Sequence, residues 1–235
     1  MFRKLKKYWF RLTHPVIGEV WQLHRVTDEV SINPDVREYE ITPRRLEALI
    51  NQYIQENYHF LSVDQLYDIV KSVKNDKKFV VITLDDGYAD NYEVAYPIFQ
   101  KYNIPFCVFV SQEYVINGHP LYRFLSINQI KELSESPLCT IGSHTVSHTR
   151  LYGLSKEEQL KEIKDCKEWL EQIINRSIGY FAYPYGAYNL DTMSVICMCG
   201  VKMAFAAWGG KVRKNTPNWI FNIPRLLVTE KGMKE

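Results

Sequence analysis

Short apolar runs alternate with segments of helical periodicity along most of this 235-residue chain. In FVVITL (79–84), five of the six residues are apolar, which is typical of a strand covered on both faces. Three later runs have a similar character: IPFCVFV (104–110), LCTIGSH (138–144) and IGYFAYP (178–184). The alternation predicts an α/β fold, with a parallel sheet inside and helices outside.

The intervening segments carry helix start signals. Thr42 followed by Pro43 is a cap with a first-turn proline, and an apolar stripe follows between residues 46 and 53. Serines begin three further expected helices, at Ser62, Ser126 and Ser155. Because no internal repeat, low-complexity tract or Gly/Ser linker interrupts residues 18–235, we expect this range to form a single domain.

Composition excludes some classes of partner. The chain has 29 basic and 27 acidic residues, and the basic residues form no long stripe interleaved with aromatic ones. Nucleic acid is therefore not an expected partner. The five cysteines are an odd number without the spacing of a disulfide framework, which favours a reducing compartment.

Residues 1–17 form a basic, aromatic N-terminal segment. It has no apolar core of the length found in signal peptides, and no stretch of the chain approaches the ~20 apolar residues of a membrane span. Two interpretations stay open: a segment lying on an anionic membrane, or a solvated end whose aromatic residues pack on the domain. We expect a cytoplasmic protein, and the first interpretation would place it at the inner face of the membrane.

Chemically active residues follow several of the expected strands. Asp85 and Asp86 end the 79–84 run, His144 ends the 138–144 run, and Pro184–Gly186 end the 178–184 run. Since parallel strands finish at a common edge, these groups should collect there. Two adjacent carboxylates at the end of a buried strand repel each other, so their charge requires a partner.

The sequence HTVSH (144–148) places two imidazoles four residues apart. On a helical turn, that spacing brings both rings to one side, where they can converge on a metal ion. Together with Asp86 they would form a site of two imidazoles and one carboxylate, which leaves positions on a divalent ion open to water and substrate. Asp85, the neighbouring carboxylate, would then be free to act as a base.

Several segments together resemble the motifs of the polysaccharide deacetylase family, also called the NodB-homology or carbohydrate esterase family 4 domain. They are TLDDG (83–87), HTVSH (144–148), FAYPYG (181–186), MAFAAWGG (203–210) and IPRL (223–226). The resemblance spans residues 79 to about 228. It implies a distorted (β/α)7-type barrel and a metal-dependent hydrolase that removes N-acetyl groups from amino sugars.

The resemblance also implies roles for individual residues. Asp85 would be the catalytic base, and Asp86, His144 and His148 would bind a divalent metal, with zinc expected ahead of cobalt or nickel. The substrate groove and oxyanion site would be formed by Pro184, Tyr185, Gly186 and Trp208. From the sequence alone, the aromatic rings of Tyr185 and Trp208 would equally suit the core.

Two departures from the family pattern stand out. Ala182 occupies the place of an arginine that orients the base, and no histidine follows His148 to act as general acid. QLHRV (22–26) resembles the opening motif of a poly-N-acetylglucosamine deacetylase subgroup, in which an N-terminal strand supplies that histidine. We therefore assign His24 as general acid, and Arg225 as the candidate that contacts Asp85.

The expected substrate is an N-acetylated sugar in a polysaccharide or a lipid-linked glycan precursor. The alternative is a catalytically silent carbohydrate-binding domain that kept its metal site. A glycosidase is disfavoured, because adjacent carboxylates are poorly placed to flank a glycosidic bond at the ~5–9.5 Å separation that this chemistry requires.

Overall fold

The computed structural model describes residues 15–29, 31, 33–72, 77–213 and 219–234. Most of the basic aromatic segment proposed for residues 1–17 lies outside these ranges. Within them, no helix is long and apolar enough to cross a bilayer.

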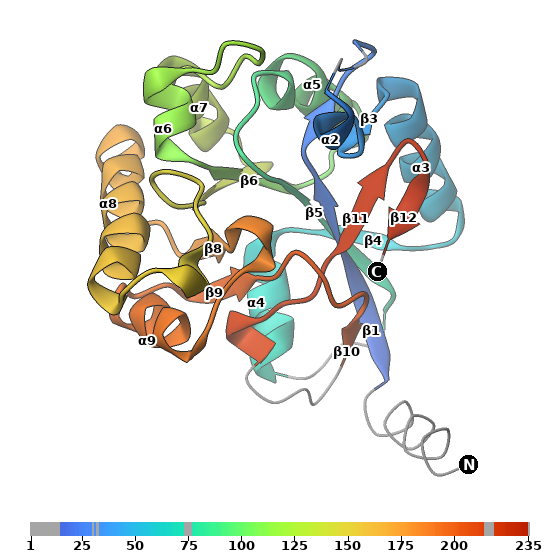
Figure 1. Cartoon of the computed structure of the whole chain (residues 1–235). Coiled ribbons are helices and arrows are strands. Elements are labelled where there is room, and N and C mark those ends of the chain that lie inside the picture. Colours follow the sequence, from blue (N-terminus) through green and yellow to red (C-terminus); the bar gives the residue numbers. More distant parts are fainter. Residues whose placement is uncertain (1–14, 30, 32, 73–76, 214–218, 235) are drawn as a thin grey trace.

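Seven parallel strands form a curled sheet at the centre of the molecule (Figure 1). In spatial order they are β11 (Leu226–Thr229), β1 (Val16–Leu23), β5 (Phe79–Leu84), β6 (Phe106–Val110), β7 (Cys139–Ser143), β8 (Tyr180–Ala182) and β9 (Met203–Phe205). The segment that leads into β11 also contacts β9, through a parallel bridge between Ile223 and Phe205. The predicted single-domain α/β fold with a distorted seven-stranded barrel is confirmed.

Five short strands lie beside this sheet. Three of them extend it and two pair with each other: β4 (His59–Leu61) on β5, β10 (Val212–Arg213) on β1, β12 (Gly232–Lys234) on β11, and β2 (Arg25–Val26) with β3 (Glu40–Ile41). From its pattern, the run GEVWQLHRV (18–26) is expected to form a single strand. In the structure β1 ends at Leu23, and His24 separates it from β2.

Helices surround the sheet (Figure 1). The α-helices are α2 (Pro34–Arg37), α3 (Pro43–Gln55), α4 (Val63–Ser72), α5 (Tyr96–Tyr102), α6 (Gln112–Asn117), α7 (Ile127–Glu135), α8 (Lys156–Ile174) and α9 (Leu190–Met198). A π-helical turn, η1 (Asn91–Ala95), leads into α5, and the 3-10 turns are η2 (Leu151–Gly153), η3 (Pro184–Gly186) and η4 (Trp219–Phe221).

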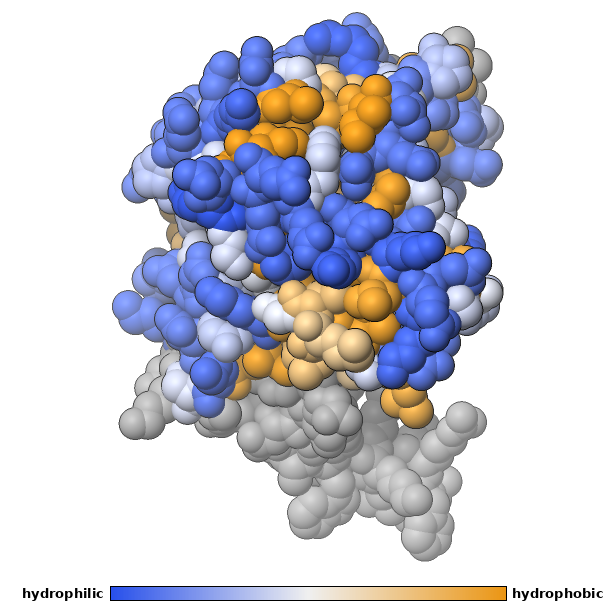
Figure 2. Space-filling view, turned by 90° about the vertical axis from the view of Figure 1, so that its left-hand side faces the viewer, coloured by the Kyte–Doolittle hydropathy of each residue, from blue (hydrophilic) through white to orange (hydrophobic). Residues whose placement is uncertain are grey.

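Helix starts follow the predicted signals. The Thr42 side chain caps α3 by accepting from the Arg45 amide, and Ser126 and Ser155 form capping boxes on α7 and α8. The 46–53 stripe of α3 is buried as expected. Figure 2 shows one side of the molecule, where hydrophilic residues cover most of the visible surface and hydrophobic ones form separate patches.

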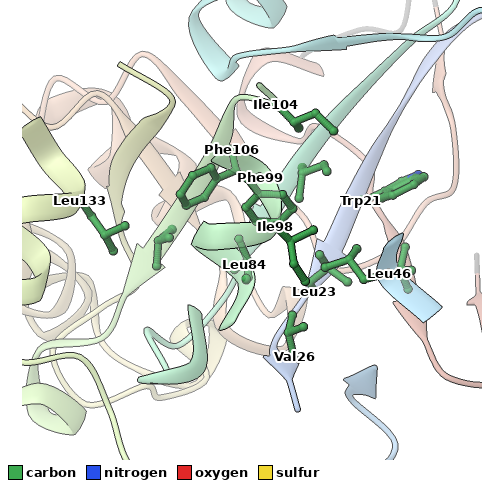
Figure 3. Packing of buried hydrophobic residues seen from close by; sticks show 14 of the residues in the cluster. Trp21, Leu23, Val26, Leu46, Leu84, Ile98, Phe99, Ile104, Phe106 and Leu133 are labelled. Carbon is green, nitrogen blue, oxygen red and sulfur yellow. The ribbon is translucent and has the colours of Figure 1, made fainter. Parts of the chain in front are cut away.

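The main core lies between the sheet and its surrounding helices. All six residues of β5 are buried, which confirms a strand covered on both faces. Figure 3 shows part of this packing, with Trp21 and Leu23 of β1, Leu84 of β5, Phe99 of α5 and Leu133 of α7. Sheet and helices thus fix the strand ends, where the polar residues collect.

Gly142 in β7 is required by a close contact. A Cβ at this position would lie 2.4 Å from Cδ1 of Phe109, a fully buried ring, and 3.1 Å from the carbonyl oxygen of Tyr180. We expect Gly142→Ala to lower the free energy of unfolding by about 1–3 kcal/mol, measured by urea denaturation. Gly153→Ala is the matched control, because a Cβ there meets no atom within 4 Å. An equal loss in both variants would contradict this explanation.

Candidate active site

A cavity of about 420 Å³ opens where β1, β5 and β7 end. Seven of the residues predicted for the site line it: His24, Asp85, Asp86, His144, His148, Tyr185 and Trp208. Pro184 and Gly186 flank Tyr185 in η3, and a Cβ on Gly186 would lie 3.2 Å from Cδ1 of Trp208. The structure therefore brings residues from five separate chain segments to one place.

Asp86, His144 and His148 form a compact donor set. Oδ1 of Asp86 lies 3.1 Å from Nε2 of His148 and 3.4 Å from Nε2 of His144, and one donor atom from each residue lies within 4.8 Å of the others. Oδ1 of Asp86 is buried without a hydrogen-bond partner. Since a buried unpaired carboxylate oxygen is costly, these residues fit a divalent cation.

Neighbouring groups orient both imidazoles toward this point. Nδ1 of His144 lies 2.8 Å from the carbonyl oxygen of Ala182, so the ring donates there and Nε2 keeps its lone pair. Nδ1 of His148 lies 3.2 Å from the Tyr114 hydroxyl. Burial would raise the pKa of Asp86, but the nearby imidazoles hold it well below its usual value.

Tyr114→Phe tests the role of this second contact. We expect the affinity for Zn²⁺ to fall about tenfold, because His148 loses the partner that fixes its ring. The stacking of residue 114 on Phe124, at 4.5 Å between ring centroids, is kept in the variant. Competition with a chelating dye measures the affinity. Tyr102→Phe is the control, since the Tyr102 hydroxyl donates to Glu47 between α3 and α5. Unchanged affinity in Tyr114→Phe would remove Tyr114 from the site.

The HTVSH segment is not the helical turn that its spacing predicted. After β7 the backbone follows an irregular loop, with φ of 67° at Thr145 and 53° at His148. These two residues turn the chain back, and that turn brings His148 beside His144. The expected convergence is present, but a loop produces it.

Unusual backbone conformations gather at this site. Seven non-glycine residues among those described have positive φ, and three of them are asparagines that follow helices or end turns: Asn57, Asn103 and Asn175. The other four are Asp86, Thr145, His148 and Tyr185. Such conformations cost free energy for residues other than glycine and asparagine, and they concentrate at functional sites.

Asp85 lies in a different environment from Asp86. Nη1 and Nη2 of Arg225 donate to its two oxygens at 2.7 Å each, and Nε2 of Gln22 donates to Oδ2 at 2.8 Å. Burial would raise the pKa of Asp85, but the Arg225 guanidinium holds it below its usual value. The carboxylate is therefore ionised and held in one orientation.

Arg225 is fully buried and immediately precedes β11. Its Nε donates to the carbonyl oxygen of Ala206 at 2.6 Å, and its Nη1 also donates to Thr83 Oγ1 at 3.0 Å. Sequence reasoning missed Gln22. Its one signal was a polar side chain in an apolar strand, two residues before His24.

His24 stands at the break between β1 and β2 and lines the cavity. Its ring lies 4.7 Å from that of Tyr39, and its Nδ1 is buried without a hydrogen-bond partner. Burial holds the pKa of the imidazole below its usual value, although the carboxylates of Asp86 and Asp85 act in the opposite direction.

At the edge of this curled α/β sheet, a carboxylate–histidine donor set lies beside an arginine-bound aspartate, an arrangement that suits metal-assisted hydrolysis. The family model of polysaccharide deacetylases matches residues 72–204. The chain belongs to the polysaccharide deacetylase family, and it is a hydrolase that acts on carbon–nitrogen bonds other than peptide bonds.

Curated relatives cover most of the chain. The YxkH protein of Bacillus subtilis is 26% identical over 207 residues, which are 88% of this chain and 70% of that protein. A poly-β-1,6-N-acetyl-D-glucosamine N-deacetylase of Staphylococcus aureus is 29% identical over 213 residues, with 85% and 71% covered.

Solved structures show the same fold. IcaB from Ammonifex degensii superposes with a TM-score of 0.80 at 25% identity, covering 92% of this chain and 93% of that one. The Streptococcus pyogenes deacetylase PplD, solved in complex with acetate, gives 0.77 at 25% identity, covering 94% and 100%.

Proposed function

We propose that this enzyme hydrolyses the N-acetyl groups of glucosamine units in a polysaccharide of the poly-β-1,6-N-acetylglucosamine type or in its lipid-linked precursor. The observation that carries the proposal is a single cavity with three groups in its lining. They are the oriented carboxylate of Asp85, the donor set formed by Asp86, His144 and His148, and the imidazole of His24. The Staphylococcus aureus relative, whose name describes a deacetylase of such a polymer, supports this substrate class.

Asp86, His144 and His148 would hold the cation, and zinc is the ion we propose, because imidazole and carboxylate donors suit it. When bound, a divalent cation supplies Lewis acidity, which acidifies a water molecule and polarises the acetamido carbonyl. Asp85 accepts the proton of the attacking water on its carboxylate. Arg225 and Gln22 keep that carboxylate ionised and oriented.

The leaving group requires a proton, because an amine anion is a very poor leaving group. His24 donates it to the departing nitrogen as general acid. The Tyr185 backbone N–H is the proposed donor to the tetrahedral oxyanion, with Pro184 and Gly186 setting its position in η3. The rings of Tyr185 and Trp208, each 48% exposed, offer faces on which a pyranose can stack.

The site of action is also a proposal. Residues 1–17 combine basic with aromatic side chains, which suits contact with an anionic membrane surface. We propose that the enzyme works on the cytoplasmic side of the membrane.

The catalytically silent binding domain is not favoured. A catalytically silent domain would not require an oriented catalytic base. The Asp85 carboxylate nevertheless accepts two hydrogen bonds from buried Arg225 and a third from Gln22. The named deacetylases among the relatives point the same way.

Acetate release decides between the two functions. Zinc-loaded protein should release acetate from β-1,6-linked N-acetylglucosamine oligomers, and chelation should abolish the release until zinc returns. Oligomers of β-1,4-linked N-acetylglucosamine and the N-acetylglucosamine monosaccharide are assayed as further substrates. Asp85→Asn should lower turnover by about 10²–10⁴-fold, since it removes the base. A fully metal-loaded protein that releases no acetate from any of these substrates would support the silent domain.

A further inference from the structure

His24 sits where regular strand pairing stops. The β1–β5 ladder ends at the pair Leu23 and Leu84, and β2 begins only at Arg25. The backbone of His24 therefore lacks a partner from either strand pairing, although the proposed reaction requires its ring in a fixed place.

A single short segment, residues 85–91, supplies the missing contacts. The Asp85 amide donates to the carbonyl oxygen of Leu23 at 2.9 Å. Nδ2 of Asn91 donates to the carbonyl oxygen of His24 at 2.8 Å. The backbone on both sides of the His24 ring is thus attached to the segment that carries the carboxylate pair.

Asp90 extends this attachment by two residues. Its Oδ2 accepts from Nε of Arg25 at 3.0 Å and its Oδ1 from the Val26 amide at 3.2 Å. Asn91 also donates to Oδ1 of Asp90 at 3.1 Å, which joins the two side chains. Nη1 of Arg25 in turn bonds Glu40 of β3 at 2.9 Å.

Burial and local geometry make this arrangement specific. Asn91 is fully buried, and the Arg25 and Asp90 side chains are 13% and 12% exposed. Asn91 is the first residue of the π-helical turn η1. Such turns are rare and are frequent at functional sites.

We propose that Asp90 and Asn91 are positioning residues, which hold the His24 segment at a fixed distance from Asp85 and Asp86. The segment 85–91 then carries the base and a metal ligand, and it also positions the acid. The inference rests on the proposed role of His24 in amide hydrolysis.

The first test is Asn91→Leu, which removes the donor but keeps the branched shape and the number of heavy atoms in the side chain. We expect kcat for N-acetylglucosamine oligomers to fall about 10²-fold, because a small displacement of a catalytic group is costly. Turnover of 4-nitrophenyl acetate should stay within about twofold, since 4-nitrophenolate leaves without a proton. Zinc content should not change.

Gln159→Met is a matched control. Gln159 is also fully buried, its Nε2 donates to the carbonyl oxygen of Leu154 at 3.0 Å, and its Oε1 has no partner, as is true of Oδ1 of Asn91. Both variants should lose thermal stability, but only Asn91→Leu should lose amide turnover selectively. Loss of both activities in equal measure, or the same selectivity in Gln159→Met, would overturn the proposal.

A readout independent of activity uses the metal-free protein. The imidazole NMR signals of His24 should shift or broaden in Asn91→Leu and stay in place in Gln159→Met. Unmoved His24 signals in Asn91→Leu would overturn the proposal even if the enzyme proved inactive on amides. Inactivity of the wild type, in contrast, would contradict the proposed function but not the positioning role of Asn91. If Asn91→Leu does not fold, Asp90→Asn replaces it, because it removes the charge facing Arg25 and keeps the shape.

Discussion

Replacing Arg225 by methionine should lower the free energy of unfolding by about 3–5 kcal/mol at neutral pH, because the Asp85 carboxylate stays buried without its partner. Arg225 is fully buried and Asp85 is 1% exposed, so water cannot replace the two lost contacts. Gln22 alone remains as a donor to Oδ2. Urea denaturation at pH 7 measures the change. Turnover should also fall, since the base loses its orientation.

The loss should depend on pH in a defined direction. In the wild type the pKa of Asp85 is held below its usual value, so its contribution to stability is present above the pKa of the unfolded chain and is lost as pH falls through the folded value. Without Arg225, the largest influence that lowers this pKa is lost, and burial then raises the pKa of Asp85 above that of the unfolded chain. The destabilisation should therefore shrink as pH falls from about 7 to about 5, where Asp85 in the variant takes up a proton.

Two further variants make the result specific. Asp85→Asn in the Arg225→Met background removes the buried charge and should recover part of the lost stability. Arg123→Met breaks an exposed ion pair with Glu93 and should cost about 0–1 kcal/mol. A loss in Arg225→Met that is the same at every pH would instead assign the effect to packing and to the bonds from Arg225 to Ala206 and Thr83.

The fold was predictable because its signals are local. A buried parallel strand such as β5 is apolar throughout, and the helices carry their own caps. Convergence of Asp86 and His144 followed from the same argument, since both residues come at or just after the ends of parallel strands in one sheet. The short strand β2 was merged into the expected 18–26 strand and β3 was missed, because two residues cannot form a pattern.

The supporting contacts were harder to predict, since they join residues far apart in the chain. Asp85 and Arg225 are 140 positions apart, and only the family resemblance suggested the pair. Gln22 carries only one weak local signal, a polar side chain in an apolar strand, and Asn91 carries none, because each acts through one hydrogen bond to a distant segment. The loop geometry of His148 was mispredicted, since a spacing of four residues suits a helical turn as well as a loop with positive φ.

His24→Ala should abolish most amide turnover, with a fall in kcat of about 10²–10⁴-fold, because the departing amine then lacks a proton donor. The amount of zinc that the variant binds should equal that bound by the wild type, since the donor set consists of Asp86, His144 and His148. Acetate release from N-acetylglucosamine oligomers and elemental analysis of the same samples measure both quantities. His59→Ala is the control, because His59 is an exposed residue of β4.

The dependence on leaving group separates an acid from a residue that only shapes the cavity. Turnover of 4-nitrophenyl acetate should fall far less than amide turnover in His24→Ala, since its leaving group requires no proton. Added imidazole should restore part of the amide turnover, because the missing ring leaves space in a cavity of about 420 Å³. Full amide turnover in the variant would exclude His24 as the acid, and loss of zinc would make it a metal ligand instead. Equal losses on amide and ester would assign it to substrate binding.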